Sequence, residues 1–288
     1  MSAKRGVTED RGSALDIRKT TFYEELVRHP EFDMELPVDA APLAWSYASP
    51  EAPGLVELRD RYGLGGLTEG RSELDAILGL LDWAHRIVEH DGGAQNPEPR
   101  NALNILSTCA ATGARVNCRM KAIVLNEAYL AMGLRSRYIT CLPAVDDGDC
   151  HVTVMVYSST LRKWLLVDPT QNTFFTSDDG TILNIIEARG AYRSGRSPRF
   201  RSIDRPVSGP MVCGGMECAT YDEFYAVYMC KNCFRFACTL SSEPGIDSRR
   251  DEPTVVLTPP GDEWATGDEP ARWGVPVVVT HNATAFLA

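Results

Sequence analysis

Hydrophobic positions recur at helical spacing in three consecutive stretches of the middle of the chain. The first predicted helix begins at Ser72, a plausible cap, and ends near residues 91–93, because its apolar residues recur every three or four positions. A second, short helix is predicted over 101–113. A third follows Asn117, with Gly133 as its stop signal. The apolar stripe of the third helix consists of Ala122, Leu125, Ala128, Tyr129 and Met132.

The pattern then changes to the alternation typical of β-strands. Strands are predicted over 136–143, 151–158 and 163–170, and STLRK forms a short hairpin between the last two. In the strand 151–158, Val152, Val154 and Val156 share one face, opposite His151, Thr153 and Met155. The segment 276–288 resembles a terminal strand. A helix followed by consecutive antiparallel strands indicates an α+β fold.

The chain of 288 residues is long enough for one principal domain with extensions. Residues 1–70 are rich in Pro and Gly and are predicted to form an N-terminal extension packed on the core. Residues 71–205 are predicted to be the core, and 206–288 a C-terminal extension that completes the domain.

Charge and hydropathy exclude two classes of partner. The net charge of −10 opposes binding to the phosphate backbone of nucleic acids. No stretch reaches the roughly 18 uninterrupted apolar residues of a membrane span, so we expect no membrane contact. The N-terminus lacks the apolar core of a secretory signal, which predicts a cytoplasmic protein. The Arg-rich run 193–205 is interpreted as a solvated loop, with a contact surface for an acidic partner as the alternative.

The nine cysteines are an odd number without a signal peptide, which favours reduced thiols over a disulfide framework. Four of them have a spacing that could hold a structural zinc ion. These four are Cys213, Cys218, Cys230 and Cys233.

Cys118 stands where the third helix should begin. Free backbone N–H groups and the positive end of the helix dipole favour a thiolate at such a position. The same N–H groups can stabilise the oxyanion that forms when a thiolate attacks a carbonyl. The position therefore suits a nucleophile.

Such a nucleophile needs a base and a group that orients the base. Of the five histidines, His151 is the natural candidate because it opens the alternating strand. Asp168 ends the next predicted strand, 168 − 151 = 17 residues later. Pairing of these strands through STLRK would bring His151 and Asp168 to the same end of the hairpin.

The order of these residues resembles the transglutaminase-like superfamily, in its bacterial form, whose fold relates to papain-type cysteine proteases. The matching segments are NCRMKAIVLNEAYLAMGLRSRYITCLP and CHVTVMVYSSTLRKWLLVDPT, and the resemblance covers roughly residues 100–205. It implies a transglutaminase-like or papain-like core, in which the helix bearing Cys118 packs on an antiparallel sheet carrying His151 and Asp168.

The resemblance also implies an activity. Cys118 would be the nucleophile that accepts the acyl group, His151 the general base and acid, and Asp168 the residue that fixes the imidazole tautomer. The expected reaction is acyl transfer through a Cys thioester on a peptide or small amide-like substrate, free or carrier-bound, with water or an amine as acceptor. Asn101 and Asn104 are the candidate side-chain donors to the oxyanion.

Two other readings stay open. One is a non-catalytic domain that keeps the same fold for binding, and the other is a protein with the zinc site described above. The resemblance implies no organic cofactor. Animal transglutaminases use calcium, but this sequence contains no EF-hand loop.

Overall fold

The computed structural model describes residues 15–36, 42–201, 203, 205–207 and 209–288. The first part of the predicted N-terminal extension and part of the Arg-rich run lie outside the described residues. The helices are η1 (Ile17–Lys19), α1 (Thr21–Arg28), α2 (Pro53–Arg61), α3 (Gly65–Thr68), α4 (Glu73–Ile87), α5 (Ala102–Thr112), α6 (Cys118–Ala131), α7 (Ile185–Arg193), α8 (Tyr221–Asn232), η2 (Ile246–Ser248), η3 (Glu263–Ala265), α9 (Glu269–Arg272) and α10 (Ala283–Leu287).

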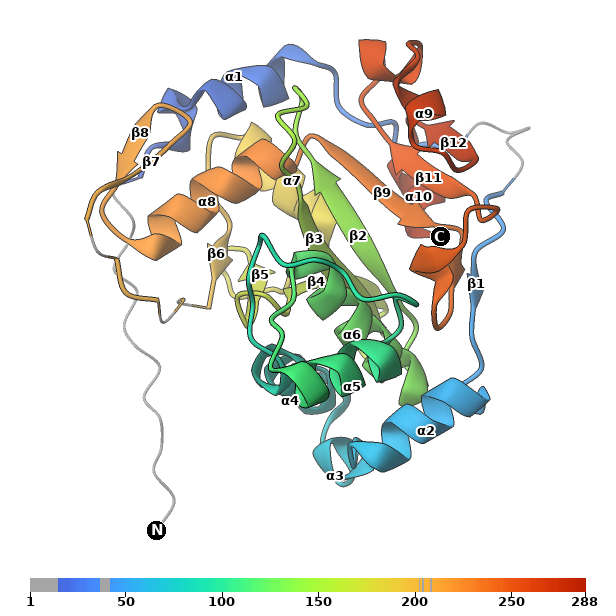
Figure 1. Cartoon of the computed structure of the whole chain (residues 1–288). Helices are drawn as coiled ribbons and strands as arrows, with labels where there is room; N and C mark the ends of the chain where they lie inside the picture. The colour runs from blue at the N-terminus through green and yellow to red at the C-terminus, as the bar shows by residue number, and fades with distance from the viewer. Residues whose placement is uncertain (1–14, 37–41, 202, 204, 208) are drawn as a thin grey trace.

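The strands form one large sheet and two small ones (Figure 1). The strands are β1 (Ser46–Tyr47), β2 (Ser136–Leu142), β3 (His151–Ser158), β4 (Lys163–Asp168), β5 (Thr173–Thr176), β6 (Arg199–Phe200), β7 (Met211–Cys213), β8 (Met216–Cys218), β9 (Arg235–Thr239), β10 (Ser241–Ser242), β11 (Thr254–Leu257) and β12 (Val277–Thr280). The large sheet has the order β12-β11-β9-β2-β3-β4-β5-β6, and each neighbouring pair is antiparallel except β11 and β12. The predicted α+β class is confirmed.

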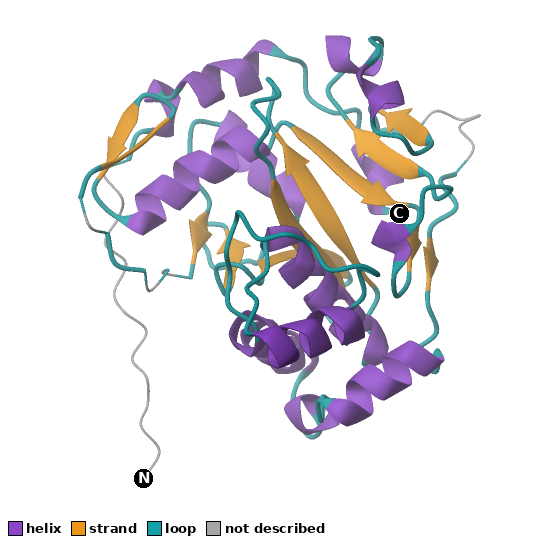
Figure 2. Ribbon diagram, in the orientation of Figure 1, coloured by secondary structure: helices purple, strands orange, loops and turns teal. Residues whose placement is uncertain are grey.

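Helices cover both faces of the large sheet, so its central strands are buried on two sides (Figure 2). Helices α2, α4, α5 and α6 contribute to the core on one face, together with Val152, Val154 and Val156 of β3. Helices α1, α7, α8 and α10 contribute to the core on the other face, together with Met155. The alternation predicted for β3 is therefore correct, but both of its faces are apolar environments.

The hairpin of β3 and β4 is paired in the predicted way. Val154 lies opposite Val167 and Ser158 opposite Lys163, so the turn consists of residues 159–162. Arg162 in this turn has a φ of 53°, the left-handed conformation that closes many tight turns. The register leaves the start of β3 and the end of β4 at the same edge of the hairpin.

Helix α6 is buried around nearly its whole circumference, which the single predicted apolar stripe does not indicate. It contacts β2 and β3 on one side and α2, α4 and α5 on the others, and residues 120–131 are all buried. Nζ of Lys121 donates to the carbonyl oxygens of His85 (2.6 Å) and Val88 (2.5 Å) at the end of α4. Oε2 of Glu127 accepts from the N–H of Ala102 (2.8 Å) at the start of α5. Lys121 lies where the dipole of α4 favours its charge, and the N–H group of α5 opposes the burial that raises the pKa of Glu127 to about 8.

Two sequence-based predictions need correction. The helix from Ser72 ends at Ile87 rather than near 91–93, because Val88 is extended and His90 forms a β-bridge with Val116. In the segment 276–288 the strand stops at Thr280, since Asn282 caps helix α10. The Pro- and Gly-rich N-terminal region contains helices α1, α2 and α3, and Pro53 occupies the first turn of α2, where a missing N–H costs nothing.

The three predicted segments of the chain are interleaved in space. From the predicted N-terminal extension, α2 packs on α6 and β1 pairs with β10. From the predicted C-terminal extension, β9 lies between β2 and β11 in the large sheet. The boundaries at residues 70 and 205 stay a prediction. None of the helices in the described ranges is both long and apolar enough to cross a bilayer.

Replacing the two consecutive leucines of β4 tests the two-core arrangement. Leu165 and Leu166 are both fully buried, one in each core. Each Leu→Ala substitution is expected to lower the free energy of unfolding by about 2–5 kcal/mol, because each leaves a cavity. Leu161, whose exposed fraction is 48%, is the matched control, and Leu161→Ala should change stability by less than about 0.5 kcal/mol. Denaturant titration measures the free energy of unfolding of the three variants. A change below about 0.5 kcal/mol for Leu165→Ala or Leu166→Ala would contradict the presence of a packed core on both faces of the sheet.

Candidate active site

Cys118 is the first residue of α6, as the sequence predicts. The side chain of Asn117 caps the helix, since its Oδ1 accepts from the N–H of Met120 (3.2 Å). Within the described part of the chain, the backbone N–H groups of Cys118 and Arg119 have no hydrogen-bond partner. The thiol is half-buried. Two free donors and the positive end of the helix dipole thus lie beside the sulfur.

His151 and Asp168 meet at the edge of the hairpin. Nε2 of His151 lies 2.7 Å from Oδ2 of Asp168, and the two side chains are 4% and 0% exposed. Oδ1 of Asp168 accepts from the N–H groups of Thr170 (2.7 Å) and Gln171 (3.3 Å). The pairing of Nε2 with Asp168 leaves Nδ1 of the imidazole available to the thiol of Cys118, whose pKa His151 lowers. The structure therefore brings the three predicted residues together.

The charges of this group stabilise one another. Burial raises the pKa of the Cys118 thiol, but the hydrogen bond to His151, its charge and an N–H of Val152 outweigh burial, so the pKa is below its usual value. Burial lowers the pKa of His151, but the negative charge and hydrogen bond of Asp168 raise it to about 10. Burial opposes the ionisation of Asp168, yet His151 holds its pKa below the usual value. Relative to isolated side chains, these shifts favour the thiolate of Cys118 and the imidazolium of His151.

Two tyrosines of α8 complete the surroundings of the imidazole, and sequence analysis missed both. The hydroxyl of Tyr225 donates to Oδ2 of Asp168 (2.5 Å), and its side chain is buried. The ring of Tyr228 packs edge-on against His151, with ring centres 5.6 Å apart. Tyr225 is 57 positions from Asp168 in the sequence. The spacing of three between the tyrosines marks one helical face, but nothing in the sequence places that face against His151.

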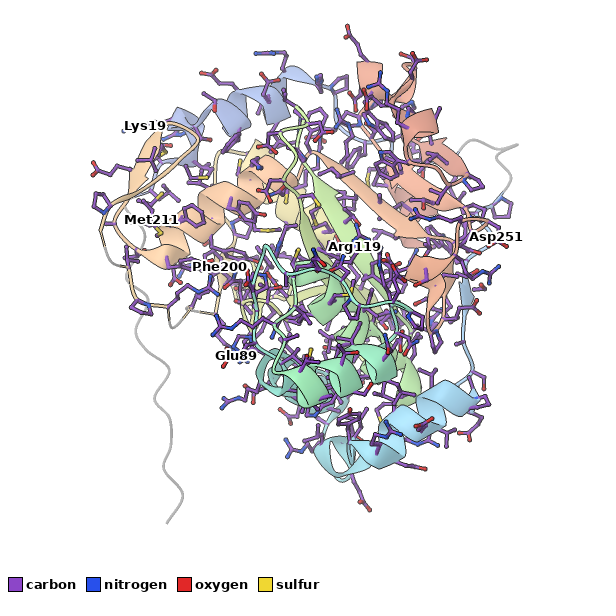
Figure 3. All side chains as sticks on the ribbon, in the orientation of Figure 1. Lys19, Glu89, Arg119, Phe200, Met211 and Asp251 are labelled. Atoms are coloured by element: carbon purple, nitrogen blue, oxygen red, sulfur yellow. The ribbon has the colours of Figure 1, made fainter. Side chains whose placement is uncertain are left out.

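Arg119, the residue after the candidate nucleophile, is engaged in an ion pair. Its guanidinium donates to Oδ1 of Asp247 (2.9 Å) and to Oγ1 of Thr140 (3.2 Å). Asp247 also receives the guanidinium of Arg100 (2.9 Å). Figure 3 labels Arg119, which lies close to the centre of the view, between the sheet and the segment leading into α5. The cation next to Cys118 is therefore neutralised within the protein.

The two asparagines proposed as oxyanion donors lie at the start of helix α5. Oδ1 of Asn101 caps α5 by accepting from the N–H of Asn104 (2.9 Å). The side chain of Asn104 donates to the carbonyl oxygen of Pro99 (2.8 Å). Oδ1 of Asn101 and the side-chain amide of Asn104 are thus engaged at the start of α5, and the N–H groups of Cys118 and Arg119 are further candidate donors to an oxyanion.

The four cysteines of the alternative zinc site are not arranged as ligands. Cys213 lies opposite Met216 and Cys218 opposite Met211, so these two thiols occupy different rungs of the β7–β8 hairpin. Cys230 and Cys233 are buried in the apolar core around α8. Across the described ranges, no group of three or more His, Cys, Asp or Glu side chains has an arrangement that could hold a metal ion.

Comparison with known families places this arrangement in a class. Residues 65–169, which contain Cys118, His151 and Asp168, match the family model of the transglutaminase-like superfamily. Residues 65–169 are therefore similar to the transglutaminase-like superfamily, as the sequence motifs indicate. No curated protein gives a significant match to the sequence.

Solved structures give partial similarities. A "putative cysteine protease" from Cytophaga hutchinsonii is 18% identical, with 53% of this chain and 49% of that one covered and a TM-score of 0.32. A "putative protease" from Parabacteroides distasonis is 14% identical, with 41% and 29% covered and a TM-score of 0.26. Red sea bream transglutaminase is 13% identical, with 56% and 33% covered and a TM-score of 0.27. The chain thus spans at most about half the length of these three proteins.

The pKa shifts predict that Cys118 is the first thiol to react. Iodoacetamide should alkylate Cys118 at pH 7 well before the other eight cysteines, because only thiolates react and the pKa of Cys118 is lowered. Cys109, half-buried with a pKa that burial raises, is the internal control and should react only at higher pH. Peptide mass spectrometry between about pH 5 and 9 gives both profiles. Equal profiles for the two thiols would reject activation of Cys118.

Proposed function

We propose that this protein is a thiol enzyme that transfers acyl groups from a peptide or amide-like substrate through a thioester on Cys118. The observation that supports the proposal is the pairing of the His151 imidazole with the Asp168 carboxylate at 2.7 Å, beside a Cys118 thiol whose pKa that imidazole lowers. Transglutaminase-like chemistry requires these three groups.

In the first half-reaction the thiolate of Cys118 attacks the carbonyl carbon of the amide. The carbonyl oxygen becomes an oxyanion beside the N–H groups of Cys118 and Arg119, at the positive end of α6. The carbon–nitrogen bond then breaks, and the leaving amine takes the proton of the His151 imidazolium. The products are a free amine and a thioester on Cys118.

In the second half-reaction the neutral His151 takes a proton from water or from an amine, which attacks the thioester. The carbon–sulfur bond breaks, and the Cys118 thiolate leaves paired with the imidazolium. Water gives a carboxylic acid and an amine gives a new amide. Asp168 keeps the imidazole in the orientation and tautomer that both steps need, and it stabilises the imidazolium.

Intact-protein mass spectrometry tests the thioester. Incubation with glutamine-containing peptides and with activated acyl esters should add the mass of one acyl group to the protein, and hydroxylamine should remove it. Cys118→Ala should give no adduct, with little loss of stability because the half-buried sulfur leaves a small cavity. An equal adduct on Cys118→Ala would reject the nucleophile. Absence of any adduct on the wild type, together with binding of these compounds, would favour the non-catalytic domain.

Asp168→Asn tests the orientation of the imidazole. The amide would keep much of the shape of the carboxylate but lose its charge, so the pKa of His151 should fall and its tautomer change. We expect the rate of acyl transfer to fall by as much as roughly 10⁴-fold, the size of the comparable effect in serine proteases. Steady-state kinetics and circular dichroism measure rate and fold together. Unchanged kinetics would remove Asp168 from the mechanism.

A further inference from the structure

Helix α8 lies outside the region that matches the family model, yet three of its side chains support the candidate site. Tyr225, Tyr228 and Lys231 are spaced by three and so lie along one side of the helix. In Figure 1, α8 is the orange helix that runs beside the central strands. This side of α8 contacts His151 by its tyrosine rings, Asp168 through Tyr225, and the segment before β3 through Tyr228 and Lys231.

Tyr225 shares one oxygen atom with His151. Its hydroxyl lies 2.5 Å from Oδ2 of Asp168, and Nε2 of His151 lies 2.7 Å from that same oxygen. Burial and the charge of Asp168 raise the pKa of Tyr225 well above its usual value, so the phenol keeps its proton and donates. The phenol ring is fixed by edge-on contact with Phe200, with ring centres 5.3 Å apart. The donor is therefore rigidly placed.

The other two side chains hold the segment that leads into His151. The hydroxyl of Tyr228 contacts Oδ1 of Asp149 and the carbonyl oxygen of Cys150, each at 3.2 Å. Nζ of Lys231, which is buried, donates to Asp147 (2.7 Å) and Asp149 (3.0 Å). The residues just before His151 are thereby tied to α8.

We propose that Tyr225 is a positioning residue of the acyl-transfer site, which sets the orientation and the charge of the Asp168 carboxylate that His151 contacts. This inference rests on the proposed function. Two backbone N–H groups bind Oδ1 of Asp168, so Oδ2 is the oxygen that contacts His151. The Tyr225 hydroxyl donates to the same Oδ2. By drawing negative charge toward itself, Tyr225 limits how strongly Asp168 holds the proton on His151.

The imidazole has several titratable neighbours, and the test must separate the effect of Tyr225 from theirs. The groups that face or influence His151 are Cys118 of α6, Asp168 of β4, Tyr225 and Tyr228 of α8, and His90 of the segment after α4. Among the described residues, two side chains form hydrogen bonds with the Asp168 carboxylate: His151 and Tyr225.

Titration of His151 in the Tyr225→Phe variant tests the proposal. We expect the pKa of His151 to rise by roughly half a pH unit or more, because Oδ2 loses a charge-assisted hydrogen bond and attracts the imidazolium more strongly. NMR of ¹⁵N-histidine-labelled protein gives this value, with His151→Gln assigning the signal. Tyr129→Phe is the matched control: it also deletes a buried tyrosine hydrogen bond, to the carbonyl oxygen of Ile77 (3.0 Å), but should leave the titration of His151 unchanged.

Replacing Tyr225 by 3-fluorotyrosine should move the titration the opposite way. Fluorine makes the phenol a stronger donor while keeping its shape, so the pKa of His151 should fall. An unchanged titration in both variants would overturn the proposal, and so would equal shifts in Tyr225→Phe and Tyr129→Phe. These outcomes do not depend on turnover, so they differ from a failure of the proposed function, in which Cys118 forms no acyl adduct.

Once an acyl donor is known, steady-state kinetics of the Tyr225→Phe variant give a second test of the positioning role. Tyr225→Phe should lower kcat by about tenfold with KM changed less than about twofold, because a more basic imidazole is a weaker acid toward the leaving amine. A loss confined to KM would assign Tyr225 to substrate binding and would contradict the positioning role.

Discussion

The burial of α6 is the constraint on which the candidate site depends. A helix surrounded on nearly all sides can keep polar residues only where each finds a partner, because an unpaired buried charge is costly. Lys121 meets the carbonyl end of α4, and Glu127 meets the N–H end of α5. These contacts fix the rotation and the height of α6, and with them the place of Cys118 against the start of β3.

The sheet supplies the second half of the arrangement. Because β3 and β4 are neighbours with a short turn, His151 and Asp168 reach the same edge without any long-range adjustment. Both side chains are withdrawn from water, which would favour their neutral forms, but the short contact between them outweighs this cost. The thiol of Cys118 then lies beside an imidazole that is already charged.

The candidate site is built from segments that lie far apart in the sequence. The nucleophile is on α6, the imidazole and carboxylate on the hairpin, and the phenol of Tyr225 on α8. The strand β9, which follows α8 directly, is paired with β2 in the middle of the large sheet. Because β9 begins shortly after α8 ends, the backbone hydrogen bonds between β9 and β2 also fix the C-terminal end of α8 against the sheet.

Those features of the site that follow from short-range rules could be predicted from the amino-acid sequence. Helical spacing and the cap at Asn117 placed Cys118 at a helix start, and alternation with a short turn brought His151 near Asp168, because such patterns act within a few residues. Which polar residues of α6 are buried, and the contact of Tyr225 with Asp168, depend on the fold of the whole chain. These contacts join elements whose relative positions follow from packing of the whole core, and no local periodicity encodes them.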